Sequence, residues 1–368
     1  MFVQKDVLAR ALATVKKSVP SKAALPILTS VNLCAEGDVL HVRGTDLETF
    51  TTASIRGDNL NEENVCVPFA TFNAAIAELE DGDITLEATE TSLKVRQGKT
   101  KIDFPAFPAM EFPLVPAMDT KDVISLEVGE TELAFARVLH AASNDMARPV
   151  LTGVYISLVG GVLTTTCADG FRMAVSNIKV ESEDEFTSLI PTSAVQVMLA
   201  ALADDGWVEI YADGERIAFN LPENEGVSTT VYCQKIEGSY VNYKQIIPAL
   251  TVAPFLVEKE EIVKALKLGK IFARNNANVI RHTVSEDLME FSSYSMEDGD
   301  FSKTISGEYD GEEISFGLNF AYEMDTLSTL SGVVAIECTS PSRPIVMYRD
   351  GERNEYLCVL MPMHIRDR

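Results

Sequence analysis

The residue types that most often perform catalysis form no recognisable constellation in this chain of 368 residues. Its four histidines are dispersed, without Ser/His/Asp or HExxH spacing: they are His41, His140, His282 and His364. The sequence contains no GxxxxGK[ST] phosphate loop and no GxGxxG motif after an expected strand. The pair Asp169-Gly170 is more typical of a turn than of a general acid. The residues therefore predict a protein that is not an enzyme.

The cysteines are scattered as well, and none forms a CxxC pair: they are Cys34, Cys66, Cys167, Cys233, Cys338 and Cys358. Most have apolar neighbours, which is typical of small buried core residues and predicts neither a metal site nor a bound cofactor. The N-terminal residues Met1–Asp6 carry charge at once, and no apolar run reaches about 18 residues. Reduced thiols without a leader or a membrane span predict a cytoplasmic protein.

The chain also contains an internal repeat. The segment Pro26–Val31 recurs as Pro149–Val154, and the same spacing pairs Gly37 with Gly160. A third and more diverged copy follows, so the repeat predicts three domains that share one fold. The expected domains are residues 1–121, 122–249 and 250–368.

Each copy is expected to begin with an amphipathic helix. Its apolar residues in the first copy have helical spacing: they are Val7, Leu8, Ala11, Leu12 and Val15. Similar helical stretches recur at Ala9–Leu12, Phe135–Val138 and Val263–Leu266. Alternating strands such as Leu40–Arg43 and Ile84–Ala88 follow. A second helix after a Pro or Asn is expected over Thr71–Glu80, Ser193–Ala203 and Phe320–Leu330, with Thr192 and Ser193 as candidate N-caps. This order predicts an α+β fold, with two helices packed on antiparallel sheets in each domain.

The charge balance limits the function but does not decide it. With 31 Lys and Arg against 55 Asp and Glu, the formal net charge is −24, which on its own disfavours nucleic-acid binding. Basic residues nevertheless gather around the first helix of each copy: Lys5, Arg10, Lys16, Lys17, Lys22, Arg137, Arg148, Lys264, Lys267, Lys270 and Arg274. Acidic residues gather at 59–63, Glu181–Glu185 and 296–300. The alternative is that these lysines form ordinary solvated helix faces.

Five segments in this order resemble the β sliding clamp of bacterial DNA polymerase III. They are Leu25–Leu28, Gly44–Glu48, Arg148–Val154, Ala168–Val175 and Val359–Met363. No single segment is diagnostic, but their order on a three-fold repeat of the right length is specific. The resemblance implies a head-to-tail homodimer in which six clamp domains form a ring, with helices inside and sheets outside. Such a ring encircles double-stranded DNA without sequence preference.

The resemblance also implies a processivity factor and assigns residues to three surfaces. The ring would tether the replicative DNA polymerase, the clamp loader and other proteins with a clamp-binding motif, and would be associated with the nucleoid. The DNA-facing bore would carry Lys16, Lys17, Lys22, Arg148, Lys264 and Lys267. The dimer interface would join Ile102 and Phe104 to Ile271 and Phe272. The partner-peptide pocket would be lined by Leu151, Ala168, Gly170, Phe171, Arg172, Met173, Val241, Gln245, Ile246, Val359, Met361, Pro362, Met363 and His364.

This chain departs from the family pattern at that pocket. Phe171 stands where the family often has His, Ala168 where it often has Thr, and His364 where Arg is usual, and the chain continues to Arg368. These changes put the peptide preference in doubt. Two alternatives remain open: a trimeric clamp of the proliferating-cell-nuclear-antigen kind, and a clamp-like array that serves only as a protein scaffold without DNA.

Overall fold

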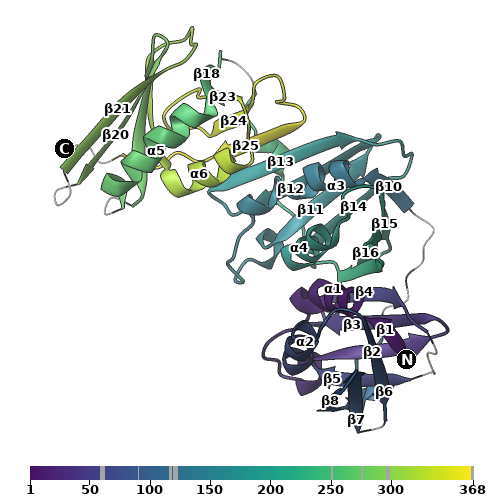
Figure 1. Cartoon of the computed structure of the whole chain (residues 1–368). Coiled ribbons are helices and arrows are strands. Elements are labelled where there is room, and N and C mark those ends of the chain that lie inside the picture. The colour runs from purple at the N-terminus through teal and green to yellow at the C-terminus, as the bar shows by residue number, and fades with distance from the viewer. Residues whose placement is uncertain are drawn as a thin grey trace. The chain divides into compact units, whose positions relative to one another are not determined.

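The computed structural model describes residues 1–58, 63–89, 91–115, 118, 123–249, 252–274, 277–295 and 299–365. The acidic segments at 59–63 and 296–300, the expected domain boundaries and the terminal residues 366–368 lie wholly or partly outside this range. The chain divides into two compact units. Unit 1 comprises Met1–Leu133 and Ser182–Ile236, and unit 2 comprises Ala134–Glu181 and Glu237–Arg368. Figure 1 labels the elements of both.

Unit 1 contains two antiparallel sheets. One has four strands in the order β1-β6-β7-β8, and the other has nine strands in the order β10-β15-β16-β17-β4-β3-β2-β5-β9. The strands of unit 1 are β1 (Phe2–Gln4), β2 (Ser30–Glu36), β3 (Val39–Thr45), β4 (Thr49–Arg56), β5 (Asn64–Pro68), β6 (Asp83–Ala88), β7 (Ser92–Gln97), β8 (Thr100–Pro105), β9 (Phe107–Pro108), β10 (Val123–Glu127), β14 (Phe186–Pro191), β15 (Trp207–Ala212), β16 (Arg216–Asn224) and β17 (Val227–Gln234).

The helices of unit 1 are α1 (Lys5–Val15), α2 (Phe69–Ala77) and α4 (Thr192–Ala201), and α3 (Val128–Phe135) begins there. Helix α1 buries Leu8, Ala11, Leu12 and Val15, and Val7 packs partly buried against the same core. This confirms the apolar face that the sequence predicts. The helix contacts α2, β3 and β4, so one apolar stripe joins it to both the second helix and a sheet.

Unit 2 repeats this organisation. Within unit 2, seven strands of one sheet run in the order β11-β12-β13-β25-β24-β23-β18, and a four-stranded sheet has the order β21-β20-β19-β22. The strands are β11 (Gly153–Val159), β12 (Val162–Ala168), β13 (Arg172–Lys179), β18 (Phe255–Glu258), β19 (Val279–Ser285), β20 (Leu288–Ser295), β21 (Gly299–Ser306), β22 (Ile314–Asn319), β23 (Val333–Glu337), β24 (Ile345–Arg349) and β25 (Tyr356–Leu360). Helices α5 (Lys259–Ala273) and α6 (Phe320–Ser328) contact each other. The fold is α+β, as expected.

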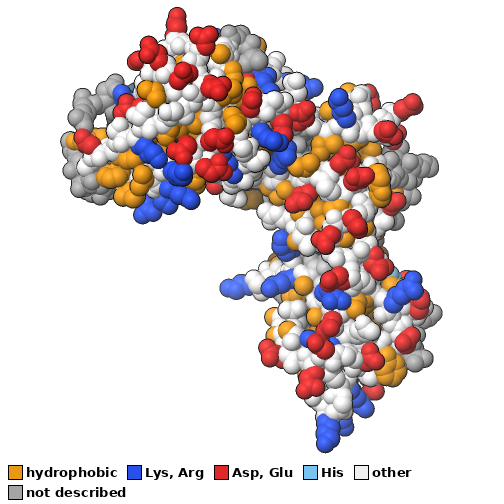
Figure 2. Space-filling model, turned by 45° about the horizontal axis from the view of Figure 1, so that its top comes forward, with side chains coloured by type: hydrophobic (Ala, Val, Ile, Leu, Met, Phe, Trp, Pro, Cys, Tyr) orange, Lys and Arg blue, Asp and Glu red, His pale blue; other side chains and the backbone are white. Residues whose placement is uncertain are grey.

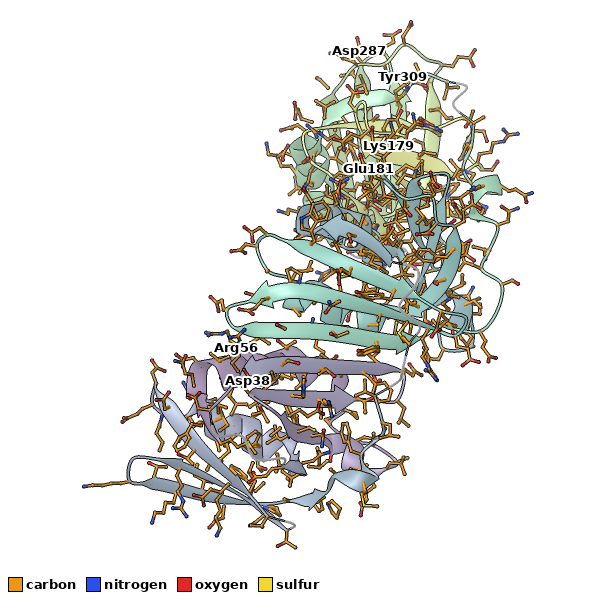
Figure 3. All side chains as sticks on the ribbon, turned by 90° about the vertical axis from the view of Figure 1, so that its right-hand side faces the viewer. Asp38, Arg56, Lys179, Glu181, Asp287 and Tyr309 are labelled. Atoms are coloured by element: carbon orange, nitrogen blue, oxygen red, sulfur yellow. The ribbon has the colours of Figure 1, made fainter. Side chains whose placement is uncertain are left out.

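The three-fold repeat is visible in individual hydrogen bonds. The first residue of α1, α3 and α5 donates its amide to the carbonyl of Gly82, Gly206 and Gly332, at 2.9, 3.0 and 3.1 Å. A second bond recurs from Gly57 to Asp38, from Val180 to Gly161 and from Gly307 to Asp287, at 2.9, 2.9 and 2.8 Å. Figure 3 shows Asp38 beside Arg56, and Asp287 beside Tyr309, at these corresponding corners. Three segments of the chain therefore share one local architecture.

The sheets continue from one copy of the repeat into the next. In unit 1, β4 is the third long strand of the first copy and pairs antiparallel with β17, the last strand of the second copy. In unit 2, β13 is the third long strand of the second copy and pairs antiparallel with β25, the last strand of the third. The same two strand positions therefore form both junctions.

Several local predictions need correction. The expected N-caps Thr192 and Ser193 are wrong, because α4 already begins at Thr192 and its N-cap is Pro191, with no side-chain hydrogen bond. A hydroxyl inside the first turn is past the position from which it can accept the next amides. The expected helical stretch Phe135–Val138 is also wrong beyond its first residue, because α3 ends at Phe135. The Asn start of α6 is confirmed, since Asn319 accepts a hydrogen bond from the amide of Ala321.

All six cysteines are buried free thiols, as the sequence predicts. Burial raises the pKa of the Cys66 thiol to about 11, which keeps it protonated near neutral pH. Within the described part of the chain, no helix combines the length and the apolarity needed to cross a lipid bilayer.

Candidate functional site

Every residue of the predicted peptide pocket lies in unit 2. The residues come from the 3-10 helix before β11, the end of β12, the turn into β13 and the start of β13, the strand β25 with the tail that follows it, and the segment before β18. Segments far apart in the sequence are joined here because β13 pairs with β25 in the register Arg172 with Leu360 and Met173 with Val359.

The turn from β12 to β13 is built around one carboxylate. Asp169 Oδ1 accepts hydrogen bonds from the amides of Phe171 and Arg172, at 2.8 and 2.9 Å. Gly170 has a φ of +93°, and a Cβ there would lie 3.2 Å from Nη1 of Arg148. Glycine therefore satisfies both the backbone conformation and the space. The expectation that Asp169-Gly170 forms a turn is confirmed.

This turn presents Phe171 beside the C-terminal tail. The amide of Met361 donates a 2.8 Å hydrogen bond to the carbonyl of Phe171. Both side chains are exposed, Phe171 by 49% and Met361 by 38%, and Ile246 is 38% exposed. Phe171 and Met361 are thus neighbours across this hydrogen bond, and adjacent large apolar side chains left in solvent are a feature of protein-binding surfaces.

Other predicted pocket residues form the apolar interior beneath this surface. Ala168, Met173 and Val359 are buried in one hydrophobic cluster, against which Val241 packs partly buried. Leu151 is buried in the short 3-10 helix Pro149–Leu151. Gln245 and His364 are exposed, while Pro362 and Met363 are half-buried. The structure thus separates the predicted set into a buried floor and an exposed rim.

Helix α6 adds residues that the sequence did not reveal. The ring of Tyr322 stacks on Phe171 with centroids 6.2 Å apart, and the guanidinium of Arg172 lies 4.6 Å from the same ring. Arg172 also pairs with Asp169 through Nε at 3.1 Å and with Asp325 through Nη1 at 2.6 Å. Tyr322 and Asp325 are three residues apart on one helix face. This spacing could be seen in the sequence, but it does not show which residues that face of α6 contacts.

A buried polar network lies beneath the site. The hydroxyl of Tyr356 donates to the carbonyl of Arg137 at 2.7 Å and lies 2.7 Å from Oγ1 of Thr329. Nearby, His140 faces Cys358 with Nε2 and the Arg137 carbonyl with Nδ1. Burial, reinforced by the positive charge of Arg172, lowers the pKa of His140 to about 4. His140 is therefore neutral near pH 7, with its proton on Nδ1.

The six predicted DNA-facing cations are all exposed: they are Lys16, Lys17, Lys22, Arg148, Lys264 and Lys267. Two of them have carboxylate partners, since Arg148 lies 3.2 Å from Asp145 and Lys264 lies 2.7 Å from Glu261. Figure 2 shows Lys and Arg side chains gathered at the upper left of the view, where Figure 1 places α5. Exposed pairs of this kind are weak, so these cations remain available to phosphates.

The predicted interface residues differ in how far their side chains are exposed. Strand β8 is the free edge of its sheet, as expected, but Phe104 is only 6% exposed and packs edge-on against Phe72 at 5.3 Å. Its side chain therefore belongs to the core of unit 1. Ile271 is 54% exposed on α5, and Phe272 stacks on Phe301 of the edge strand β21.

Comparison with known families gives one consistent result. Three domain models of the DNA polymerase III beta subunit match in order: the N-terminal domain over residues 1–116, the central domain over 125–241 and the C-terminal domain over 244–364. Together they cover nearly the whole chain, and each falls on one copy of the repeat. The matched family is the bacterial one and not the trimeric clamp that the sequence left open.

Individual relatives agree with the family match. The chain is 25% identical to the beta sliding clamp of Streptomyces coelicolor, over 99% of this chain and 98% of the relative, and 25% identical to that of Treponema pallidum, over 99% of both. Among solved structures, the DNA polymerase III subunit beta of Pseudomonas aeruginosa superimposes with a TM-score of 0.92 at 21% identity, covering 99% of this chain and 100% of the other. The sliding clamp of Bacillus subtilis gives 0.92 at 22% identity, covering 99% of both.

Proposed function

The chain belongs to the DNA polymerase III beta subunit family, and we propose that it works as a head-to-tail dimeric ring that slides on duplex DNA. It is a beta sliding clamp with three tandem clamp domains, a non-catalytic processivity subunit associated with DNA polymerase III. The dimer, the bore and the peptide pocket are the parts of this function that the chain's own residues must provide. We further propose that the domains divide near 121 and 249 and that the protein acts in the cytoplasm, at the nucleoid.

The observation that carries the dimer is the pair of sheet junctions. Each one joins the third long strand of one copy to the last long strand of the next, as in β4 with β17 and β13 with β25. Applied once more, this rule leaves β21 of the third copy and β8 of the first copy, and both are free edges of four-stranded sheets. Pairing β21 of one subunit with β8 of another satisfies both edges and repeats the same junction.

Side chains beside these edges support the same interface. Ile271 and Phe272 lie on α5, which contacts β21, and the exposed Ile271 offers apolar area next to the free strand. Ile102 on β8 is half-buried, while Phe104 contributes through the strand backbone because its side chain is committed to the core. Two such junctions close a pair of subunits into a ring, since each subunit has one edge of each kind.

The exposed cations support the proposed mode of DNA binding. Lysine and arginine side chains on helices and loops contact phosphates without reading base edges, and this suits a protein that moves over every sequence. The large excess of acidic residues repels DNA from the remaining surface. Binding is therefore weak at equilibrium, and the closed ring provides the durable attachment.

The apolar surface around Phe171, Met361 and Ile246 supports binding of short linear peptides. Its rim is exposed and its floor is packed, which suits insertion of one or two apolar anchors. We propose that the polymerase, the clamp loader and other proteins with the same kind of motif share it. Methionine on the rim adapts to different partner side chains.

The mass of the native particle tests the dimer directly. At micromolar concentration, light scattering should give twice the subunit mass of 40.2 kDa. A particle of 40.2 kDa would rule out the ring and leave the scaffold alternative without DNA.

A further inference from the structure

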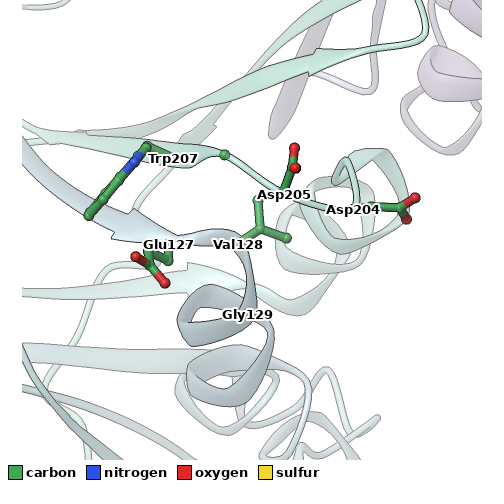
Figure 4. Close-up of a pocket in the computed structure, with 7 residues that line it drawn as sticks. Glu127, Val128, Gly129, Asp204, Asp205 and Trp207 are labelled. Carbon is green, nitrogen blue, oxygen red and sulfur yellow. The ribbon is translucent and has the colours of Figure 1, made fainter.

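A hollow of about 280 Å³ lies where α3 begins, on residues that the peptide pocket and the cation set do not include. It is lined by Glu127, Val128, Gly129, Asp204, Asp205, Gly206 and Trp207. Figure 4 shows the indole of Trp207 on one side, with Glu127 below it, and Val128 extending towards the loop of Asp204 and Asp205. The lining carries three carboxylates and no lysine or arginine.

The other two copies of the repeat show what occupies this position. The helix-starting residue is a lysine in both. In the first copy, Nζ of Lys5 lies 3.2 Å from Oδ1 of Asp81, in the loop before Gly82, the glycine that recurs as Gly206 and Gly332. In the third copy, Nζ of Lys259 donates to the carbonyl of Leu330 at 2.7 Å, in the corresponding loop. An ammonium group therefore seats against this loop twice within the same chain.

The second copy keeps the acceptors but lacks the cation. Val128 occupies the helix-starting position, and its amide makes the same bond to Gly206 that Lys5 makes to Gly82. The strand register pairs Glu127 with Trp207 as it pairs Gln4 with Asp83, so Asp205 corresponds to Asp81, the residue that holds the Lys5 ammonium. The position is thus an ammonium seat whose own lysine is replaced by an apolar residue.

Trp207 gives the seat a second feature that favours a cation. It is 57% exposed, the highest value for any aromatic side chain in the described residues. An exposed indole face attracts an ammonium group and packs against the methylene stem of a lysine. Carboxylates on the other side add charge attraction that a neutral ligand cannot use.

We propose that this hollow receives a lysine side chain from a segment of another protein. The proposal goes beyond the peptide pocket of unit 2, because it gives the chain a second attachment point, in unit 1, with the opposite chemistry: charge and one indole in place of apolar anchors. A partner that carries an apolar motif and a basic segment then gains affinity from two weak contacts on one chain.

Tryptophan fluorescence tests the proposal, because Trp207 is the one tryptophan of the chain. The probe is an acetylated, amidated pentapeptide with lysine at its second and fourth positions, and its match has norleucine at both. The full-length protein in low salt should show a saturable change with the lysine peptide, in about the millimolar range. The norleucine peptide should bind at least about tenfold more weakly, and added salt should lower the affinity for the lysine peptide.

Variants separate the seat from general charge attraction. Val128→Lys restores the lysine of the other two copies and should lower the affinity for the lysine peptide at least about tenfold. Val159→Lys makes the same change at an exposed site of β11 outside the hollow and should leave the affinity unchanged. Circular dichroism confirms that both variants fold; if Val128→Lys does not, Asp205→Asn takes its place.

Three outcomes would overturn the proposal. The first is equal binding of the norleucine peptide, and the second is unchanged binding by Val128→Lys. The third is saturation by free spermidine with no response to the lysine peptide, because the occupant would then be a small polyamine and not a protein segment. None of these outcomes would affect the sliding function, which depends on the ring and the pocket.

Discussion

The backbone amide of Met361 donates a 2.8 Å hydrogen bond to the backbone carbonyl of Phe171, across a separation of just over half the chain. This bond extends the pairing of β13 with β25 by one position beyond Arg172 and Leu360. It places two exposed apolar side chains as cross-strand neighbours, where their surfaces can act together. The peptide surface therefore depends on the junction between the second and third copies of the repeat.

Truncating either neighbour should weaken peptide binding. A peptide with Leu and Phe anchors should bind the unmodified protein with a dissociation constant near 1 μM, or about −8 kcal/mol. Phe171→Ala and Met361→Ala should each cost about 1 kcal/mol, since both are partly exposed contacts. Fluorescence polarisation measures the affinity, with Val159→Ala as an exposed control on β11. Unchanged affinity in both variants would place the peptide elsewhere.

The tail after β25 is held by a second backbone bond, from the amide of Met363 to the carbonyl of Gly317 on β22 at 2.8 Å. A Cβ at Gly317 would lie 2.8 Å from Cγ1 of Ile365 and 2.9 Å from the carbonyl oxygen of Met363. Gly317→Val should therefore displace the tail and lower the affinity for the peptide about fivefold, because the position of Met361 is no longer fixed. The same titration measures this.

Two further variants control for damage to the fold. Gly214→Val adds the same side chain where an added Cβ would meet nothing within 4 Å, and it should bind normally. Ile365→Gly removes the tail contact without crowding β22 and should lower the affinity for the peptide as Gly317→Val does. Normal binding by Ile365→Gly would show that the tail position is irrelevant to the pocket.

The stability of the protein should depend on pH through His140. Its pKa falls from 6.5 to about 4 on folding, chiefly because of burial and secondly because of Arg172. The unfolded chain therefore binds the proton more readily between these values, so the contribution is complete above pH 6.5 and is lost as the pH falls towards 4. At about 1.4 kcal/mol per pH unit, the loss reaches about 2 kcal/mol at pH 5.

Urea unfolding at pH 7.5 and pH 5 measures this contribution. His140→Gln removes the titrating group, so its free energy of unfolding should fall by about 2 kcal/mol less between the two pH values than that of the unmodified protein. An equal fall in both proteins would mean that folding does not lower the pKa of His140.

The dimer should depend on Ile271. Ile271→Asp places a charge at the proposed junction of β8 and β21 and should yield particles of 40.2 kDa at micromolar concentration. Phe104 is the wrong position for this test, because replacing a core residue packed on Phe72 should cost about 3–5 kcal/mol of stability by itself. Val159→Asp, exposed on β11, serves as the control, and a dimer that survives Ile271→Asp would move the interface elsewhere.

Much of the fold could be predicted because its signals are local and repeated. The apolar face of α1 and the alternation in β3 and β6 follow from side-chain periodicity, and the repeat carries the same order to the other copies. The N-cap of α4 could not be predicted reliably, because Pro191 and Thr192 are both acceptable before a helix and only the backbone decides between them.

The site was predictable only in part, for a physical reason. Phe171 and Met361 were identified by resemblance, but their partner Tyr322 lies on another helix, and no sequence pattern shows which face of α6 contacts the turn at Asp169. Likewise, the alternation around Phe104 indicates one buried face without saying whether its own core or another subunit covers it. Both questions concern contacts between segments distant in sequence.

The central claim is that a closed ring, and not surface affinity, holds this protein on DNA. Its test is retention of the clamp loaded onto nicked circular DNA, before and after the circle is cut. Equilibrium binding through exposed cations such as Lys22 and Arg148 should weaken with salt, with a log–log slope of about −0.9 per phosphate neutralised. The account predicts that clamps on intact circles survive moderate salt and leave within moments of linearisation. Equal retention on circular and linear DNA with free ends would contradict it and favour an ordinary surface-binding protein.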